Sequence, residues 1–207
     1  MYTLYSFGTP NGLKPTIMLE ELEQPYKLEL IDIKKGEQFN PDFLNISPNN
    51  KIPVLHDHDK KFYLFESVAI LQYLAEKHGK FLHKTLHDKY MVLQWCYFQV
   101  AHIGPMFGQL GHFQRFASEK IPYAIKRYTD ECNRLFAVME KQLNHNPFIS
   151  GGTYTIADMA IWPWVYGYQV FYQQVIDPQQ FPSLAEWYQL LSERPAIQAA
   201  LQAYGQS

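Results

Sequence analysis

The sequence has few cysteines, no long apolar run and little net charge, and each of these absences excludes a class of protein. Two cysteines occur, Cys96 and Cys132, and neither belongs to a Cys-x-x-Cys motif. This usage excludes a disulfide-stapled secreted scaffold and favours a reducing, cytoplasmic location. No apolar run approaches the roughly 20 residues that span a bilayer, so we expect no membrane segment. The first residues also lack the basic and apolar regions of a signal peptide.

The charge balance excludes nucleic acid as a partner. The chain has 18 basic and 20 acidic residues, which gives a formal net charge of −2 and no basic footprint. His56 and His58 lie close together in the sequence, but no third residue completes a metal-ligand spacing, so we predict no metal site. With 207 residues, 47% of them hydrophobic, the chain can bury the cores of two modest domains.

The first eighty residues alternate strand and helix patterns. The order β-α-β-α-β-β-α predicts a mixed four-stranded sheet with helices on both faces, a thioredoxin-like α/β fold for residues 1–80. A proline inside a helix is tolerated only in the first turn, so Pro15 predicts a helix that starts near Asn11 to Leu13. The expected strands are 2–5, 26–33, 54–56 and 61–63, and the expected helices follow residue 11, residue 40 and residue 66.

The rest of the chain reads as helical. Residues 81–88 are polar without a strand pattern and are interpreted as a linker, so residues 89–207 form the predicted all-α C-terminal domain. Gly104-Pro105 and Gly108 are expected to interrupt or kink its first helix. Thr155-x-x-Asp158 before an apolar run is the pattern of a capping box.

The segment Lys51-Ile52-Pro53, followed by Glu66-Ser67, carries most of the chemical information. A proline that leads an apolar strand belongs at its first residue or edge, and a cis bond there would turn the Ile52 backbone groups toward a peptide ligand. Glu66 and Ser67 begin a helix, where free N–H groups and a hydroxyl suit a carboxylate and Glu66 suits an ammonium. A short peptide with both groups near one end has this layout, and glutathione fits it.

These residues together resemble the glutathione-binding domain of glutathione transferases, and the Thr155–Asp158 box extends the resemblance to the helical domain. The strings Thr9-Pro10-Asn11-Gly12 and 46–53, with 36–39 and 121–128, resemble in particular the nu-class bacterial glutathione transferases and the fungal nitrogen-regulator proteins of the same fold. The resemblance implies disulfide reduction by glutathione without an essential protein cysteine.

The group that activates the glutathione sulfur is expected between the first strand and the first helix. A thiol with a pKa near 8.5 needs donors and a helix N-terminus to ionise at neutral pH. Tyr5, Ser6, Thr9 and Asn11 are the candidates there. Thr9 and Asn11 are the preferred pair because they lie at the mouth of the helix, where Asn11 would cap it.

The resemblance also implies a role for each of the other matched residues. It implies a homodimer in which Arg127 reaches the partner's ligand, and one or two glutathiones, or one glutathione disulfide, at each site. The remaining implied contacts are Gln38 and Lys51 with the glycyl end, Ile52 and Pro53 with the cysteinyl backbone, and Glu66 and Ser67 with the γ-glutamyl end.

We therefore predict a glutathione-dependent disulfide-bond oxidoreductase of the transferase family, with a glutathione thiolate held by Thr9 and Asn11. Two alternatives remain open from the sequence. One is a conventional transferase that conjugates glutathione to electrophiles, and the other is a non-catalytic regulatory protein that binds glutathione on the same fold.

Overall fold

The computed structural model describes residues 1–206 and divides into two compact units, which are described separately. One unit consists of Met1–Leu82 with the segment from Glu193 onward, and the other is His83–Ser192. The sequence-based range 89–207 assigned the whole C-terminal region to one helical domain. In the structure the last helix instead packs within the first unit.

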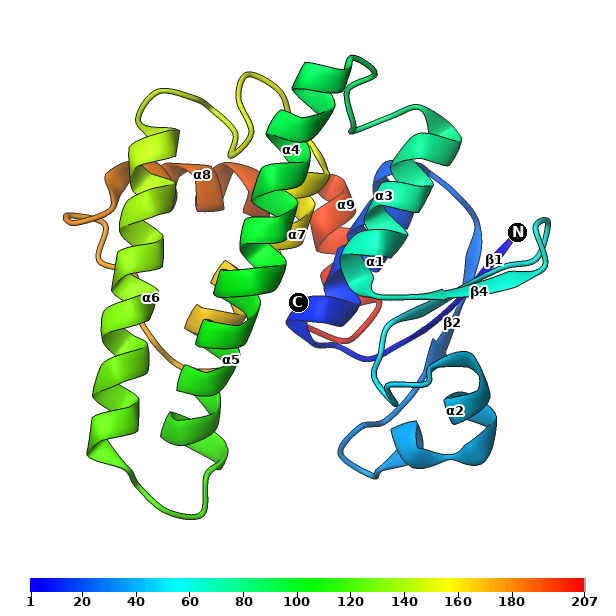
Figure 1. Cartoon of the computed structure of the whole chain (residues 1–207), viewed down its shortest axis with the longest axis horizontal. Helices are drawn as coiled ribbons and strands as arrows, with labels where there is room; N and C mark the ends of the chain where they lie inside the picture. The colour runs from blue at the N-terminus through cyan, green and yellow to red at the C-terminus, as the bar shows by residue number, and fades with distance from the viewer. Residues whose placement is uncertain (207) are drawn as a thin grey trace. The chain divides into compact units, whose positions relative to one another are not determined.

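A mixed four-stranded sheet with the order β2-β1-β3-β4 is the centre of the first unit (Figure 1). β1 is parallel to β2 and antiparallel to β3, and β3 and β4 form an antiparallel hairpin. This is the predicted thioredoxin-like arrangement. The strands are β1 (Tyr2–Ser6), β2 (Tyr26–Leu30), β3 (Val54–Asp57) and β4 (Phe62–Phe65).

Helices pack against this sheet, and successive side chains of each strand point to opposite faces of it. Leu4 and Leu55 are neighbours in the register and are 0% and 1% exposed. α1 (Pro10–Glu21) and α3 (Ser67–His78) pack against each other and against the sheet, while α2 (Pro41–Ile46) contacts β4. Each fully buried aliphatic side chain contributes about 1.5–3 kcal/mol of hydrophobic stabilisation.

The start of α1 differs from the prediction. The helix begins at Pro10 with Thr9 as its N-cap, so Pro15 lies in the second turn rather than in the first. Pro15 removes one backbone donor there, and the Thr16 hydroxyl donates to the Gly12 carbonyl at 3.0 Å in the same stretch. The prediction that Asn11 caps the helix was therefore wrong.

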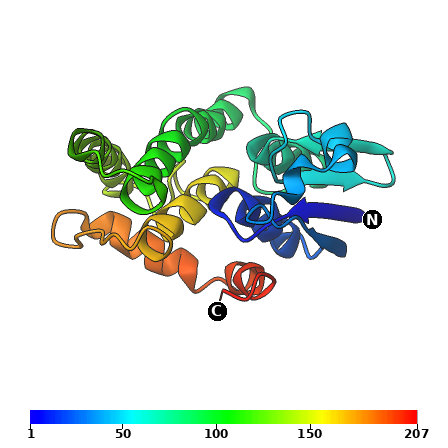
Figure 2. The ribbon, with the colours of Figure 1, turned by 90° about the horizontal axis from the view of Figure 1, so that it is seen from below.

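The C-terminal helix α9 (Pro195–Gln202) packs against α1 (Figure 2). Hydrogen bonds hold the chain near both ends of this helix. Arg194 donates two hydrogen bonds to the Glu21 carboxylate at 2.7 and 2.9 Å. Beyond α9, the hydroxyls of Tyr204 and Thr16 are 2.8 Å apart, and Gln206 donates to the Gly8 carbonyl at 2.7 Å. The last residues of the described chain therefore brace α1 and the loop that precedes it.

A buried carboxylate ties the β3–β4 hairpin to α3. Asp57 is 1% exposed and accepts hydrogen bonds from the Tyr73 hydroxyl and from Lys77 Nζ. Its other oxygen accepts from the backbone N–H groups of Asp59 and Lys60 in the hairpin turn. Burial opposes ionisation, yet the bonds from Lys77 and Tyr73 outweigh it and lower the pKa of Asp57 to about 2.

The second unit is helical. Gly104-Pro105 and Gly108 were expected to interrupt or kink its first helix. A π-helical segment interrupts the helical path between α4 (Leu86–Phe98) and α5 (Gly104–Gly111), directly before Gly104, and α5 continues through Gly108. Pro105 falls within the first two positions of α5, where its missing N–H is tolerated. The other helices are α6 (Pro122–Leu143), α7 (Ile156–Val170) and α8 (Pro182–Ser192), and the π-helical segments are Gln99–Ile103 and His112–Phe116.

The capping box at the start of α7 is confirmed and anchors the core of this unit. Asp158 is fully buried, and its Oδ2 accepts from the Thr155 backbone N–H at 3.0 Å. Its Oδ1 accepts from the Ile149 N–H and from Trp187 Nε1, each at 2.9 Å. One carboxylate thus joins a loop, α7 and α8. Within residues 1–206 no helix is long and apolar enough to cross a membrane.

We predict that Asp57→Asn lowers the free energy of unfolding by about 2 kcal/mol at neutral pH, because the folded-state pKa lies well below the unfolded value near 3.9. A carboxylate with a lowered pKa stabilises the fold above its unfolded pKa, and this contribution is lost as the pH falls through the folded value. Urea unfolding of both proteins at several pH values from about 7 to 3 measures the difference.

The matched control is Asp59→Asn, because Asp59 lies in the same turn with a side chain that is 65% exposed. It should leave the pH dependence close to that of the wild type. An Asp57→Asn variant with the wild-type loss of stability below about pH 4 would contradict the role assigned to Asp57.

Candidate functional site

The sheet register brings three turns of the chain to one end of the first unit. Tyr5 is opposite Val54, and Val54 is opposite Phe65. The end of β1, the start of β3 and the end of β4 therefore coincide. Thr9, Ile52 and Ser67 each lie within four residues of these paired positions, so the sequence-predicted residues converge at this end of the sheet.

Thr9 and Asn11 occupy the N-terminus of α1. Thr9 Oγ1 accepts from the Gly12 N–H at 3.2 Å, which leaves the hydroxyl hydrogen available to donate away from the helix. Asn11 is the second residue of the helix and is partly exposed. A hydroxyl and an amide thus lie beside the positive end of the helix dipole, an arrangement that stabilises an anion.

Gly12 is required by the close approach of the chain to itself. A Cβ atom at this position would lie 2.0 Å from the Phe7 carbonyl oxygen and 2.6 Å from Ser6 Oγ. The first contact is with backbone, which cannot rotate aside as a flexible side chain can. Only glycine therefore allows the loop of residues 7–9 to fold back over the start of α1.

The other two candidates belong to the packing of the sheet. Ser6 is 0% exposed, so its hydroxyl has no surface from which it reaches a ligand. Tyr5 is partly buried with its ring 6.3 Å from that of Tyr63, and burial raises its pKa. Of the four candidates, Thr9 and Asn11 are therefore the two at the helix mouth.

The start of β3 presents backbone rather than side chains. The Ile52–Pro53 bond is cis. The strand pairing begins at Val54, so Ile52 lies outside the paired residues and is partly exposed. Ser47, itself 1% exposed, holds the adjacent backbone by donating to the Lys51 carbonyl at 2.8 Å. The exposed Lys51 side chain extends from this fixed segment.

Gln38 comes from the segment that follows β2. It lies in a single 3-10 turn, Glu37–Phe39, and its Oε1 is buried without a hydrogen-bond partner among residues 1–206. A buried amide oxygen without a partner is uncommon and calls for a donor from a ligand or a water molecule. Gln38 therefore has capacity for a ligand contact.

The turn between β4 and α3 is strained. Glu66, the residue before the helix, has φ +74°, a conformation that non-glycine residues seldom adopt. Such strain is concentrated at ligand-binding sites and switches. Ser67 is the first residue of α3 and is 7% exposed, and its Oγ accepts from Lys14 Nζ at 3.2 Å.

Lys14 was missed by the sequence analysis. It lies on α1 between Leu13 and Pro15 and is only 1% exposed. A charged residue inside a run of buried residues is unusual, because burying an ammonium costs several kcal/mol unless it is partnered. The signal in the sequence was therefore a lysine at a core-facing position of the helix pattern.

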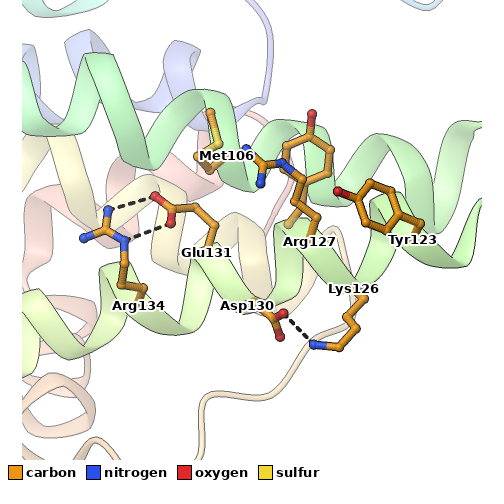
Figure 3. A pocket seen from close by; sticks show the side chains of 8 residues that line it. Met106, Tyr123, Lys126, Arg127, Asp130, Glu131 and Arg134 are labelled. Carbon is orange, nitrogen blue, oxygen red and sulfur yellow. Dashed lines mark hydrogen bonds and ion pairs between the residues drawn. The ribbon is translucent and has the colours of Figure 1, made fainter.

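Arg127 lies in the second unit, where it lines a cavity of about 670 Å³ between α5 and α6 (Figure 3). Two neighbouring ion pairs form between residues of α6: Lys126 with Asp130 at 2.6 Å, and Arg134 with Glu131 at 2.8 Å. Arg127 joins neither pair, and within the described chain it makes no ion pair. The bond from Arg134 is the main cause of the lowered pKa of Glu131, and the charge of Arg127 adds to it without forming an ion pair.

The sheet, the helical unit and the grouped donors define a glutathione S-transferase. The chain matches the family model for the glutathione S-transferase N-terminal domain over residues 1–76 and the model for the C-terminal domain over residues 122–190. The chain belongs to this family. The resemblance and fold class expected from the sequence are therefore confirmed.

Among its relatives, the chain is 46% identical over 206 residues to the disulfide-bond oxidoreductase YfcG of Escherichia coli, covering 97% of this chain and 94% of that protein. It is 42% identical over 206 residues to the disulfide-bond oxidoreductase YghU of the same organism, covering 94% of this chain and 72% of that protein.

Solved structures agree with this assignment. A glutathione transferase family member from Pseudomonas fluorescens with two glutathiones bound superposes with a TM-score of 0.91 at 39% identity, covering 97% of this chain and 92% of that one. A glutathione transferase from Pseudomonas putida with one glutathione disulfide bound per subunit gives 0.92 at 38% identity, covering 99% and 92%.

We predict that the two cysteines are chemically silent in the folded protein. Neither is disulfide-bonded, both are 0% exposed, and burial raises the pKa of Cys132 to about 12. The double variant Cys96→Ala/Cys132→Ala should keep most of any glutathione-dependent disulfide reductase activity. Steady-state assays of the folded variant test this, with thiol titration of the native and unfolded wild type as the control. Loss of activity with an intact fold would assign the chemistry to a protein thiol.

Proposed function

We propose that this protein is a glutathione-dependent disulfide-bond oxidoreductase. The observation that carries the proposal is the convergence of Thr9, Asn11, Ile52 and Ser67 at one end of a sheet, in a unit whose sequence contains no cysteine. Such a site binds a small thiol and activates it, and it does not supply a thiol of its own.

Glutathione matches the order of groups along this end of the sheet. Its γ-glutamyl carboxylate accepts from Ser67 and the first N–H groups of α3, and its ammonium faces Glu66. Its cysteinyl backbone pairs with the unpaired groups of Ile52, beside Pro53, as an added strand. Its glycyl end faces Gln38 and Lys51. The sulfur then lies near the start of α1.

Thr9 and Asn11 lower the pKa of the glutathione thiol by donating to sulfur. The thiolate is the nucleophile, and donors at a helix N-terminus favour it over the thiol. Because Thr9 Oγ1 already accepts from Gly12, its hydroxyl hydrogen is available to donate to sulfur. This preorganisation means that no rearrangement is needed when charge develops on sulfur.

The reaction proceeds by two thiol–disulfide exchanges. The glutathione thiolate attacks one sulfur of the substrate disulfide, forms a mixed disulfide and releases the other sulfur as a thiolate, which takes up a proton. A second glutathione thiolate attacks the glutathione sulfur of the mixed disulfide and releases the second thiol. Two glutathiones are oxidised to glutathione disulfide, and the substrate is reduced to two thiols.

The bound ligands of related structures support a site that holds both glutathiones. The Pseudomonas fluorescens protein contains two glutathiones and the Pseudomonas putida protein contains glutathione disulfide. Two glutathiones are the reductant that the overall reaction consumes, and glutathione disulfide is the product to which they are oxidised. Conjugation of glutathione to an electrophile needs only one glutathione, so the paired ligands favour disulfide reduction.

A paired assay separates the candidate activities. We expect glutathione-dependent reduction of a small disulfide to be faster than conjugation of a chlorinated aromatic electrophile. The reverse order would favour a conventional transferase. Binding of glutathione with neither activity would favour a regulatory protein.

We also propose a cytoplasmic homodimer in which Arg127 contacts the ligand bound by the partner. α4 carries large exposed apolar side chains, with Leu86 76%, Tyr90 59% and Tyr97 56% exposed. Faces of this kind are common at subunit interfaces. Arg127 supplies a cation beside a cavity, and two-fold symmetry would present it once to each site.

Asn11 is predicted to contribute more to catalysis than Tyr5. Loss of one donor to a charged sulfur costs on the order of 1.5–3 kcal/mol, so Asn11→Ala should slow turnover roughly tenfold to a hundredfold. Tyr5→Phe should remain within a few-fold of the wild type. Thr9→Val should have a smaller effect than Asn11→Ala, and Thr9→Ser, which keeps the hydroxyl, should be close to normal.

The measurements are steady-state disulfide reduction and the pH at which bound glutathione develops thiolate absorbance. If Tyr5→Phe lost most of the disulfide reductase activity while Asn11→Ala retained it, sulfur activation would be assigned to the tyrosine and the proposed mechanism would be overturned.

The role of Arg127 in the partner's site predicts complementation. Arg127→Ala and Asn11→Ala homodimers should each be impaired, but a mixed dimer contains one site with both residues intact. Statistical mixing by co-expression should then restore roughly a quarter of the wild-type activity, since half of the dimers are mixed and each has one working site. Arg134→Ala mixed with Asn11→Ala is the control, because Arg134 is already paired with Glu131 within α6 and has no assigned role in the partner's site. No recovery, or a monomer by sedimentation, would count against a contribution from the partner.

A further inference from the structure

A buried ammonium lies directly behind the serine that begins α3. Lys14 is 1% exposed and is among the largest fully buried side chains of the protein. Its Nζ lies 3.2 Å from Ser67 Oγ, a buried contact between residues that are 53 positions apart in the sequence. The mechanism described above assigns no role to this charge.

The contact fixes the direction of the hydrogen bond between Lys14 and Ser67. An ammonium group carries three donors and no acceptor, so in this pair Ser67 Oγ must accept. The hydroxyl hydrogen of Ser67 is then directed elsewhere, and the backbone N–H of Ser67, at the first position of α3, has no partner within the helix. Ser67 therefore presents its hydroxyl hydrogen and its backbone N–H to a ligand as donors.

Lys14 also adds positive charge where the helix dipole is already positive. The positive end of α3 and the ammonium act in the same direction on an anion at Ser67. A group at hydrogen-bonding distance from Ser67 Oγ lies within about 6 Å of Nζ, a range in which an opposite charge strongly favours an ionised partner. Burial limits screening by salt.

We propose that Lys14 is a positioning residue for the carboxylate of the bound ligand: it holds Ser67 as a hydrogen-bond donor and supplies a buried charge behind the carboxylate. The inference rests on the proposed function, in which this ligand group is the γ-glutamyl α-carboxylate of glutathione. Lys14 contacts Ser67 and not the reacting sulfur, so it acts on binding rather than on the chemical step.

Two substitutions separate the hydrogen bond from the charge. Lys14→Met fills the same space with a side chain of similar length and removes both. Lys14→Gln retains a donor for Ser67 and removes the charge. Both remove the buried ammonium, and replacement of a buried charge by a well-packed apolar group is often tolerated by the fold. Lys80→Met is the control, because the exposed Lys80 follows the opposite end of α3.

The test is calorimetric binding of two ligands to each variant: glutathione, and its analogue γ-aminobutyryl-cysteinyl-glycine, which lacks the α-carboxylate. Lys14→Met should weaken glutathione binding at least tenfold and leave the weak binding of the analogue nearly unchanged. Lys14→Gln should have an intermediate effect, and Lys80→Met none. In steady-state assays the KM for glutathione should rise in Lys14→Met while kcat changes less than threefold.

A double-mutant comparison gives a readout that a merely structural lysine would not affect. Ser67→Ala alone should weaken glutathione binding, and adding Lys14→Met should then cause a smaller loss than it does in the wild type, because the two residues act on one carboxylate. Equal weakening of glutathione and the analogue by Lys14→Met, or full additivity with Ser67→Ala, would overturn the proposal.

Failure of the proposed function would be recognised separately. If the wild type bound no glutathione, the assignment of the site itself would fall, and this inference with it. If the wild type bound glutathione and Ser67→Ala weakened it while Lys14→Met did not, the site would stand and only the role of Lys14 would be wrong.

Discussion

The pairing of Tyr5 with Val54, and of Val54 with Phe65, is the constraint on which the site depends. A shift of one residue in either pairing would turn the buried face of that strand to the other side of the sheet. Leu4 and Leu55 on the buried face therefore fix the same register that aligns the ends of the strands. Packing of the core and alignment of the ligand-binding turns are consequences of one arrangement.

The turns at this end of the sheet contribute donors in different ways. Thr9 and Ser67 lie at the starts of two helices, while the backbone of Ile52 lies outside the strand pairing. Two buried residues support these donors. Gly12 permits the tight loop before α1, and Lys14 donates a hydrogen bond to Ser67. Because these supports are buried, the donors are preorganised before a ligand arrives.

Much of this arrangement could be predicted from the sequence because it rests on local rules. The succession of strands and helices along the first eighty residues, the proline before β3 and the Thr155–Asp158 capping box each depend on short-range patterns or on the geometry of a single turn. The same is true of the helix that begins at Ser67. The proposal of a carboxylate site at that helix therefore rests on residues adjacent in the chain.

The remaining features depend on contacts between distant residues. Thr9, and not Asn11, caps α1, and Pro15 lies inside the helix, which a rule for isolated helices would not allow. The packing of α9 on α1 through Arg194 and Glu21 joins residues that are 173 positions apart. The contact between Lys14 and Ser67 likewise appears only once α1 and α3 are packed. Tertiary packing outweighs local preference at each of these positions.

A crystal structure of the protein with glutathione tests the central claim most directly, namely that a glutathione thiolate is held at the mouth of α1. The account predicts the sulfur within about 3.5 Å of the Asn11 amide or the Thr9 hydroxyl, with the γ-glutamyl carboxylate on Ser67. A sulfur directed at Tyr5, or a carboxylate bound away from the start of α3, would contradict it.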